Sequence, residues 1–298
     1  MKKAIVFGGT GFLGSHVADE LSNRGYNVTI FDIKPSQYIV SNQEMVIGNI
    51  LDLNDVMEAV KGMDYVYNFA GLADIDDAKD NPIKTAQLNI MGNINILEAS
   101  RLHKVKRFVF ASSAYVFSNS GGFYKASKQS SEKFIEEYQK RYDLKFTILR
   151  YGSLYGRRSD YRNGIHRLIK GALDDHKITY KGSGEELREY IHVEDAARLS
   201  VDILDEKYSN RHLMLTGIEK MRVSDLMYMI KEILGGNVDL EFSKERFTAH
   251  YKVTPYSYTP TIGHKLVSTD HVDIGQGILD VIAELNENME IEGWRDRN

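Results

Sequence analysis

The 298-residue chain has no cysteine, four prolines, 24 glycines and a formal charge of −4 from 38 basic and 42 acidic side chains. Its length allows one large or two modest domains with a substantial buried core. The lack of cysteine excludes disulfides, cysteine zinc sites, iron–sulfur ligation and thiolate nucleophiles. Any chemistry must use hydroxyls, amines, carboxylates, imidazoles or a bound cofactor. The near-neutral charge gives no electrostatic reason to expect a nucleic-acid or membrane partner.

The N-terminus begins with Lys2-Lys3 and a short apolar run, as a signal peptide does. Glycines from Gly8 onward and the acidic pair Asp19-Glu20 interrupt the pattern before an apolar region develops. We therefore expect no export signal and a cytoplasmic protein.

In the first half of the chain, short runs of β-branched and aromatic residues alternate with longer helical patterns, which predicts a parallel sheet with crossover helices. The first helix has Leu13, Val17 and Leu21 on one face and ends at Arg24-Gly25. Further helices are expected at about 82–103 and 124–142. This alternation predicts an α/β, doubly wound (Rossmann) fold with ligands at the carboxyl ends of the strands. The expected strands are residues 3–7, 27–32, 45–48, 64–69, 107–111 and 145–150.

Beyond residue 150 the alternation stops. Residues 153–163 are polar and glycine-containing, 223–234 have a helical pattern, and the tail contains Pro255 and Pro260. We predict a dinucleotide-binding domain of residues 1–163 plus about 190–216. A smaller substrate-binding region would comprise about 164–189 plus 217–298.

A glycine-rich string, Gly8-Gly9-Thr10-Gly11-Phe12-Leu13-Gly14, lies between the first expected strand and the first helix. Glycines there permit a tight turn and let a pyrophosphate approach the N–H groups at the helix N-terminus. Asp32, at the end of the second expected strand, would accept hydrogen bonds from an adenosine ribose and repel a 2′-phosphate, which favours NAD over NADP. The glycine string could instead form a simple turn, and Asp32 could be a solvated aspartate. The nearby Lys34 weakens the repulsion of a 2′-phosphate.

Tyr124 and Lys128 lie four residues apart on an expected helix, after Ser112-Ser113 at the end of the fifth strand. They share a helix face, so the ammonium can lower the phenol pKa from about 10 toward the working pH. The phenol oxygen could then exchange a proton with a reacting hydroxyl. By itself the pair occurs by chance in many helices, but the dinucleotide motif favours a catalytic interpretation.

The chain resembles the extended short-chain dehydrogenase/reductases, specifically the NAD-dependent epimerase/dehydratase family that modifies nucleotide sugars. The resemblance runs nearly end to end. Beside the glycine string, Ser112-Ser113 and the Tyr124–Lys128 pair, it rests on residues 48–52, 68–71, Asn89 with 97–99, 149–151 with 155–156, 182–184 and 188–195.

This resemblance implies that Ser113 hydrogen-bonds the sugar, Tyr124 is the general acid/base, and Lys128 holds the nicotinamide ribose. Ser153 and Arg188 would contact the substrate diphosphate. His192 is expected to make a structural hydrogen bond, and no metal site is expected. The implied NAD-binding residues are Gly8, Gly11, Phe12, Leu13, Gly14, Asp32, Ile33, Asn49, Ile50, Phe69, Ala70, Gly71, Asn89, Ala111, Tyr124, Lys128, Tyr151 and Gly152.

Several departures from the family pattern reduce the number of reactions that the resemblance implies. Ala114-Tyr115 replace the acidic pair of the 4,6-dehydratases and the glutamate of the nucleotide-uronate decarboxylases, and the chain lacks the cysteine base of ketosugar 3,5-epimerases. Ser153 replaces the family asparagine before Tyr155-Gly156, so either Ser153 contacts the diphosphate or that contact is absent. Tyr124 follows Ser113 by only 11 positions, which opens the sugar pocket or shifts the tyrosine.

These features predict an NAD-dependent nucleotide-sugar 4-epimerase that acts through a 4-keto intermediate in polysaccharide biosynthesis. One alternative is a 4-dehydrogenase or 4-reductase that releases or consumes the ketone, and a less favoured one is a non-catalytic dinucleotide sensor. The resemblance also implies a homodimer formed by the helices at about 82–103 and 124–142. Tyr251, Tyr256 and Tyr258 are expected to be core or surface aromatics.

Overall fold

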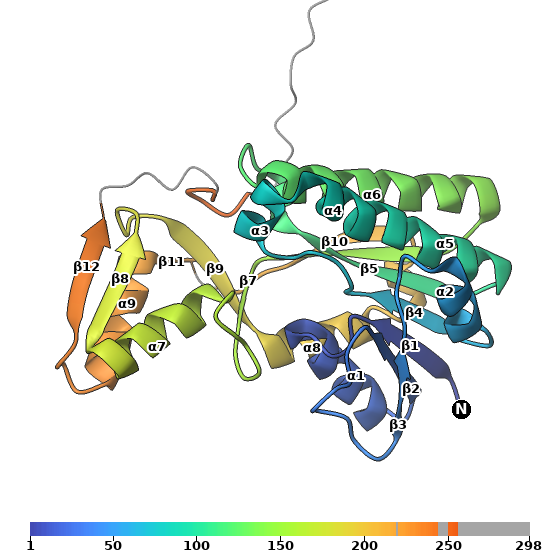
Figure 1. Cartoon of the computed structure of the whole chain (residues 1–298), viewed down its shortest axis with the longest axis horizontal. Coiled ribbons are helices and arrows are strands. Elements are labelled where there is room, and N and C mark those ends of the chain that lie inside the picture. Colours follow the sequence, from blue (N-terminus) through green and yellow to red (C-terminus); the bar gives the residue numbers. More distant parts are fainter. Residues whose placement is uncertain (219, 244–249, 256–298) are drawn as a thin grey trace, which may run out of the picture. The chain divides into compact units, whose positions relative to one another are not determined.

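A seven-stranded sheet organises the chain in the computed structural model, which describes residues 1–218, 220–243 and 250–255 (Figure 1). All of these residues belong to one unit, Met1–Thr259, and a second unit, Pro260–Asn298, lies outside the described residues. In the described part of the chain, no helix has both the length and the apolarity needed to cross a membrane.

The sheet is parallel throughout and has the order β10-β6-β5-β4-β1-β2-β3. The chain builds outward from β1 in one direction and then from β4 in the other, so the order reverses between these two strands. That reversal is the switch point of a doubly wound fold, as the alternating pattern predicted. The strands are β1 (Lys3–Phe7), β2 (Asn27–Asp32), β3 (Gln43–Ile47), β4 (Tyr65–Asn68), β5 (Arg107–Ser113), β6 (Phe146–Tyr151) and β10 (Arg211–Leu215).

All six expected strands are present. Two have the predicted bounds, and the ends of the others differ from the prediction by at most two residues. The strand expected at 45–48 ends before Gly48, whose N–H donates to Asp32 O at 3.0 Å. A Cβ on Gly48 would lie 2.6 Å from the Phe31 ring, so the chain passes closely over that ring. β5 continues two residues further than expected, and Ser113 pairs in register with Tyr151.

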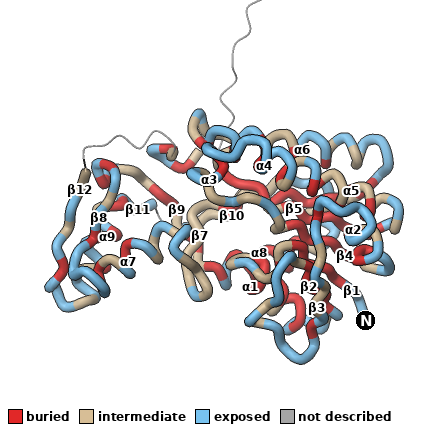
Figure 2. Tube along the Cα trace, viewed as in Figure 1, coloured by how far each residue is buried: buried red, intermediate tan, exposed pale blue. Residues whose placement is uncertain are grey.

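Helices cover both faces of the sheet because successive strand residues point to opposite sides. Ala4 and Val6 of β1 pack in the cluster that includes residues of α1 (Phe12–Asn23) and α8 (Val193–Asp202). Ile5 and Phe7 pack in the cluster that includes α2 (Leu53–Val60), α5 (Gly92–Leu102) and α6 (Gly122–Tyr142). Figure 2 shows the sheet as the buried centre between these two layers.

The long helix expected at about 82–103 is interrupted. It begins as α4 (Pro82–Ala86), widens into a π-helical turn at Gln87–Met91, and continues as α5. The helices expected at 124–142 and 223–234 are α6 and α9 (Val223–Ile233). The remaining helical elements are α3 (Ile75–Asp80), α7 (Gly164–Asp175) and the 3₁₀ turns η2 (Ala114–Phe117) and η3 (Glu206–Tyr208).

After β6 the chain forms two small sheets that the sequence pattern did not reveal. One has the order β11-β9-β7, from Lys220–Arg222, Leu187–His192 and Ser153–Tyr155. The other pairs β12 (Asp239–Ser243) in parallel with β8 (Lys177–Lys181), against α7 and α9. The polar stretch at 153–163 thus contains a short strand, β7.

Candidate active site

The glycine loop between β1 and α1 is too tightly packed for a side chain at Gly8 and at Gly14. Gly8 has a φ of +75°, and a Cβ there would lie 2.6 Å from Ala70 N. A Cβ on Gly14 would lie 2.3 Å from Gly8 O, so the start of α1 packs directly on the turn. Gly11 is the N-cap of α1 and offers no capping side chain. The first N–H groups of the helix are therefore open to an anion such as a pyrophosphate.

Asp32 lies beside this loop and binds it. Its Oδ2 accepts hydrogen bonds from the Thr10 hydroxyl at 2.6 Å and the Thr10 N–H at 3.2 Å, and its Oδ1 accepts from Ile33 N–H at 2.8 Å. A carboxylate accepts about four hydrogen bonds, so capacity remains for a ribose hydroxyl. Thr10, which the sequence did not single out, fixes the orientation of the carboxylate.

The other residues predicted to contact NAD follow the carboxyl ends of β3 and β4. Ile50 is buried, and its carbonyl accepts from the Asn95 amide at 2.9 Å. Phe69 stacks on Tyr67 with the ring centroids 6.1 Å apart. Gly71 has a φ of +144°, and a Cβ there would lie 2.5 Å from Asn89 Oδ1. These residues line the same edge of the sheet as the glycine loop.

Asn89 lies on the π-helical turn and joins three segments. Its amide nitrogen donates to Leu72 O at 3.0 Å and to Ser127 Oγ at 2.9 Å, and its Oδ1 accepts from Leu72 N–H at 2.7 Å. The side chain is buried, and it bonds to Leu72 and Ser127. Asn89 therefore holds the loop after β4 against α6.

Ser113, Tyr124 and Lys128 come together at the end of β5. All three side chains are buried, and the Ser113 hydroxyl forms a hydrogen bond with the Tyr124 phenol. Lys128 Nζ donates to Ala111 O at 2.7 Å and lies 5.8 Å from the centroid of the Tyr124 ring. The predicted catalytic residues are thus neighbours in space.

The short connection between Ser113 and Tyr124 is made by η2 and two glycines. Gly121 and Gly122 have φ values of +101° and +46°, which favour glycine, and they lead directly into α6. The chain turns back tightly enough that Tyr124 stays within hydrogen-bonding reach of Ser113 despite the short loop.

Burial shifts the pKa values of Tyr124 and Lys128 in opposite directions. It raises the pKa of Tyr124 to about 12, and the hydrogen bond from Ser113 opposes this only in part. It lowers the pKa of Lys128 to about 8, against the charge of Glu132, which raises it. The net pKa shift of Tyr124 is thus upward, opposite to the sequence-based expectation, because desolvation dominates and the Lys128 ammonium donates its hydrogen bond to Ala111 O.

The residues predicted to bind substrate lie on β9 and β7. Arg188 is buried, with its guanidinium stacked 4.6 Å from the centroid of the Tyr251 ring, and Nη1 donates to Leu187 O at 3.1 Å and Lys252 O at 3.4 Å. Ser153 is partly buried and pairs in register with Tyr190.

Tyr151 and Gly152 join the main sheet to β7. The Tyr151 hydroxyl is 2.6 Å from Ser200 Oγ, and a Cβ on Gly152 would lie 2.9 Å from Thr216 Cγ2. His192 packs edge-on against Tyr155, with the ring centroids 5.2 Å apart.

An aromatic row connects Tyr124 with Arg188. The Tyr115 ring lies 6.3 Å from that of Tyr124 and 4.5 Å from that of Tyr251, measured between centroids, and its hydroxyl is 2.5 Å from His250 Nδ1. Tyr251 is buried, as a core aromatic would be, but it lies among site residues. No sequence signal linked these tyrosines, which are far apart along the chain. Tyr256 and Tyr258 lie outside the described residues.

A family model described as the NAD-dependent epimerase/dehydratase family matches residues 4–215. The chain belongs to this family.

Two relatives in the NAD-dependent epimerase/dehydratase family differ in the reaction that their names give. A putative UDP-glucose 4-epimerase of Methanocaldococcus jannaschii is 26% identical over 95% of this chain and 98% of its own length. A UDP-N-acetyl-α-D-glucosaminuronate decarboxylase of Bacillus cytotoxicus is 27% identical over 78% of this chain and 80% of its own. The chain therefore resembles both kinds of enzyme at a similar level of identity.

A solved family structure has the same fold. The UDP-glucose 4-epimerase of Thermotoga maritima, determined with UDP-glucose, superposes with a TM-score of 0.80 at 26% identity, covering 86% of this chain and 90% of that one.

The residues present fit the NAD that the family uses. The glycine loop leaves no room for side chains beside the α1 N-terminus, and Asp32 keeps acceptor capacity next to it. The Ser113–Tyr124–Lys128 set lies at the carboxyl end of β5, two strands from β1 in the sheet, so both parts of the site lie on one edge.

Proposed function

We propose that the protein is an NAD-dependent nucleotide-sugar 4-epimerase that acts through a 4-keto intermediate. The observation that carries this proposal is the buried set of Ser113, Tyr124 and Lys128 at the same sheet edge as the glycine loop. A protein that only sensed the dinucleotide would not need a phenol and a serine hydroxyl hydrogen-bonded to each other.

The chain's own residues supply the proton transfer. Ser113 holds the oxygen on C4 of the sugar. Tyr124 first releases its own proton to solvent, and the phenolate then removes the proton from that hydroxyl as the ketone forms. Lys128 places a positive charge beside the phenol and stabilises the phenolate while it exists. Bound NAD supplies the hydride acceptor and donor. Reduction of the ketone on its other face, with the proton returned by Tyr124, gives the epimer.

A 4-reductase or 4-dehydrogenase is the second candidate, and the high pKa of Tyr124 favours its reductive direction. With a pKa of about 12, the phenol is protonated at neutral pH and is ready to protonate a ketone oxygen. Decarboxylation has less support, because Ala114 and Tyr115 provide no carboxylate next to Ser113.

The substrate in this proposal is a nucleotide-diphosphate sugar, and the UDP sugars named for the relatives are the first to test. Arg188 and Ser153 would contact the diphosphate, with Arg188 held by Tyr251 and the carbonyls of Leu187 and Lys252. We propose that residues 1–163 plus about 190–216 bind the dinucleotide and that about 164–189 plus 217–298 bind the sugar nucleotide. A cytoplasmic location is part of the same proposal.

The test is incubation with a panel of nucleotide sugars, followed by mass spectrometry, NMR of C4 and NADH absorbance. An epimerase gives a product of unchanged mass with inverted C4. A dehydrogenase gives a product two hydrogens lighter together with NADH. If no nucleotide sugar is altered in the presence of NAD or NADH, the proposal is wrong.

A further inference from the structure

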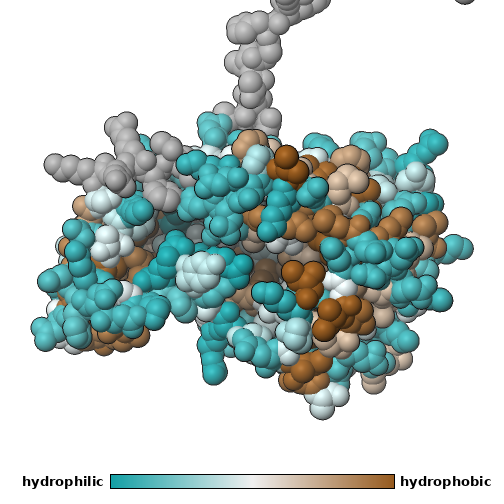
Figure 3. All heavy atoms as spheres, viewed as in Figure 1, coloured by the Kyte–Doolittle hydropathy of each residue, from teal (hydrophilic) through white to brown (hydrophobic). Residues whose placement is uncertain are grey.

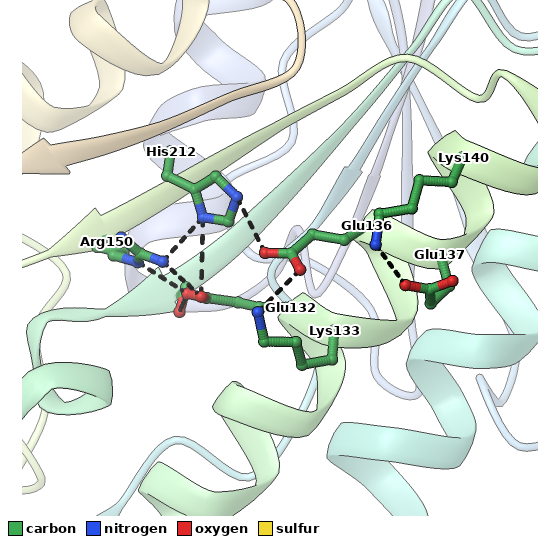
Figure 4. A network of polar contacts seen from close by, with 8 residues as sticks. Glu132, Lys133, Glu136, Glu137, Lys140, Arg150 and His212 are labelled. Carbon is green, nitrogen blue, oxygen red and sulfur yellow. Dashed lines mark hydrogen bonds and ion pairs between the residues drawn. The ribbon is translucent and has the colours of Figure 1, made fainter. Parts of the chain in front are cut away.

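Helix α6 carries a buried carboxylate, Glu132, one turn beyond Lys128 (Figure 4). Glu132 Oε1 accepts a hydrogen bond from Ser112 Oγ at 2.5 Å and from Arg150 Nε at 3.0 Å. Glu132 Oε2 accepts from Arg150 Nη2 at 2.6 Å. Glu132 therefore joins α6 to β5 through Ser112 and to β6 through Arg150.

The outer side of this network reaches the edge strand β10. His212 Nδ1 lies 2.8 Å from Arg150 Nη2, and His212 Nε2 lies 3.3 Å from Glu136 Oε1. Burial lowers the pKa of His212, and the charge of Arg150 lowers it further, so the imidazole is neutral at pH 7. The centre of the network is thus the Glu132–Arg150 pair, which is joined by two hydrogen bonds.

Glu132 also acts on the residues assigned to catalysis. Ser112, its partner, lies between Ala111, whose carbonyl accepts from Lys128 Nζ, and Ser113, whose hydroxyl binds Tyr124. The Lys128 ammonium is surrounded by the rings of Phe110 and Tyr124 and the Ala111 carbonyl. The charged group that favours its protonated form is Glu132, while Arg150 and His212 lie behind that carboxylate.

We propose that Glu132 is a positioning residue of the active site, which fixes the end of β5 against α6 and keeps the Lys128 ammonium charged. The expected effect of Glu132 on turnover rests on the proposed function, whereas its effect on the protonation of Lys128 does not. A purely structural ion pair would stabilise the fold and leave the protonation of Lys128 unchanged.

The direct test compares Glu132→Gln with Glu136→Gln. Both variants lose one carboxylate from the same face of α6. Glu132 bonds Ser112 and Arg150, whereas Glu136 contacts Lys133 and His212. The pKa of Lys128 is measured by NMR titration of lysine-labelled protein, with its signal assigned as the one missing from Lys128→Met. We expect Glu132→Gln to lower the pKa of Lys128 by about 1 and Glu136→Gln to leave it unchanged.

Loss of the carboxylate alone leaves Arg150 unpaired and partly buried, which can prevent folding. Glu132→Gln with Arg150→Met removes both charges and provides a second measurement. A folded variant of either kind with the wild-type Lys128 pKa overturns the proposal.

Kinetics then separate this proposal from the proposed function. If the wild-type enzyme converts a nucleotide sugar, Glu132→Gln should move the alkaline limb of its kcat profile to lower pH by about 1, with little change in KM. A profile that falls in amplitude without moving indicates a structural role and overturns the proposal. If the wild-type protein converts no nucleotide sugar, the proposed function fails, and the NMR titration still decides the role of Glu132.

Discussion

Tyr124 and Lys128 are buried to a similar degree, and burial shifts their pKa values in opposite directions. It disfavours the phenolate and the ammonium alike, so the tyrosine keeps its proton while the lysine pKa falls to about 8. The pair therefore does not begin as a phenolate beside an ammonium. To accept a proton from the sugar hydroxyl, the phenol must first release its own proton to solvent, and the charged lysine stabilises the phenolate that remains.

Replacement of the catalytic phenol should remove activity and leave the fold intact. Tyr124→Phe loses the hydroxyl that bonds Ser113, and we expect turnover of the accepted nucleotide sugar to fall by about 100-fold to 10,000-fold. Steady-state kinetics measure this change. The matched control is Tyr138→Phe on the same helix, which loses a hydrogen bond to Glu98 far from the site and should retain turnover. Unchanged turnover in Tyr124→Phe would show that the catalytic assignment is wrong.

Lys128 should lower stability at neutral pH while serving catalysis. Its folded-state pKa of about 8 lies below its ordinary value of 10.5, so between these pH values the unfolded chain binds more protons than the folded protein. The lysine thus opposes folding below pH 8, and this effect disappears as pH rises toward 10.5. The free energy of unfolding of wild type minus that of Lys128→Met should increase between pH 7 and pH 10. Denaturant titrations at both pH values measure it, and a constant difference contradicts the shifted pKa.

At the scale of elements, the sequence predicted what depends on regular spacing. The strands of the parallel sheet, the buried face of α1 and the positions of α6 and α9 followed from the sequence pattern, and the glycine loop from its place between a strand and a helix. The small strands β7, β8 and β12 were missed because they are short and none has more than one buried residue. The row from Tyr124 through Tyr115 and Tyr251 to Arg188 depends on long-range packing, which local patterns do not encode.

The glycine loop provides a test at this scale. Gly14→Ala would place a Cβ 2.3 Å from Gly8 O, so the turn must move away from α1. We expect the dissociation constant for NAD to rise at least tenfold, because the N–H groups at the helix terminus lose their alignment. Calorimetric titration with NAD measures this. Gly164→Ala is the control, since that helical glycine has no heavy atom within 4 Å of a new Cβ, and its affinity should stay at the wild-type value.

At the scale of the whole molecule, α4, the π-helical turn, α5 and α6 expose apolar side chains. Ile83, Met91, Leu102, Phe134 and Tyr142 are all more than one-third exposed, and Figure 3 shows apolar surface in the region of α4 and α5. These helices are the ones from which a homodimer was predicted, and covering such side chains would favour association. The dimer prediction came from family resemblance, because composition and periodicity do not distinguish a surface that binds a partner from one that stays exposed to solvent.

Oligomeric state tests this surface. Sedimentation of the wild-type protein at micromolar concentration should show a dimer, and Ile83→Asp should shift it toward monomer. Ile83 on α4 and Ile233 on α9 are both 75% exposed, so Ile233→Asp introduces the same change away from the predicted interface and should leave the dimer intact. A wild-type protein that sediments only as a monomer contradicts the prediction.

The π-helical turn at Gln87–Met91 puts the two halves of one continuous helix out of phase. A π-helical turn holds one residue more than an α-helical turn, and each residue rotates an α-helix by about 100°. The side chains before the turn and those after it therefore follow the same α-helical repeat but with a shift in phase. A single apolar stripe cannot run from Pro82 to Leu102. Deletion of one residue within the turn would give a more regular helix. It would also rotate Asn89 away from Leu72 and Ser127. The deletion variant would therefore have a more regular helix than the wild-type protein but would lose the bonds that hold the loop after β4 against α6.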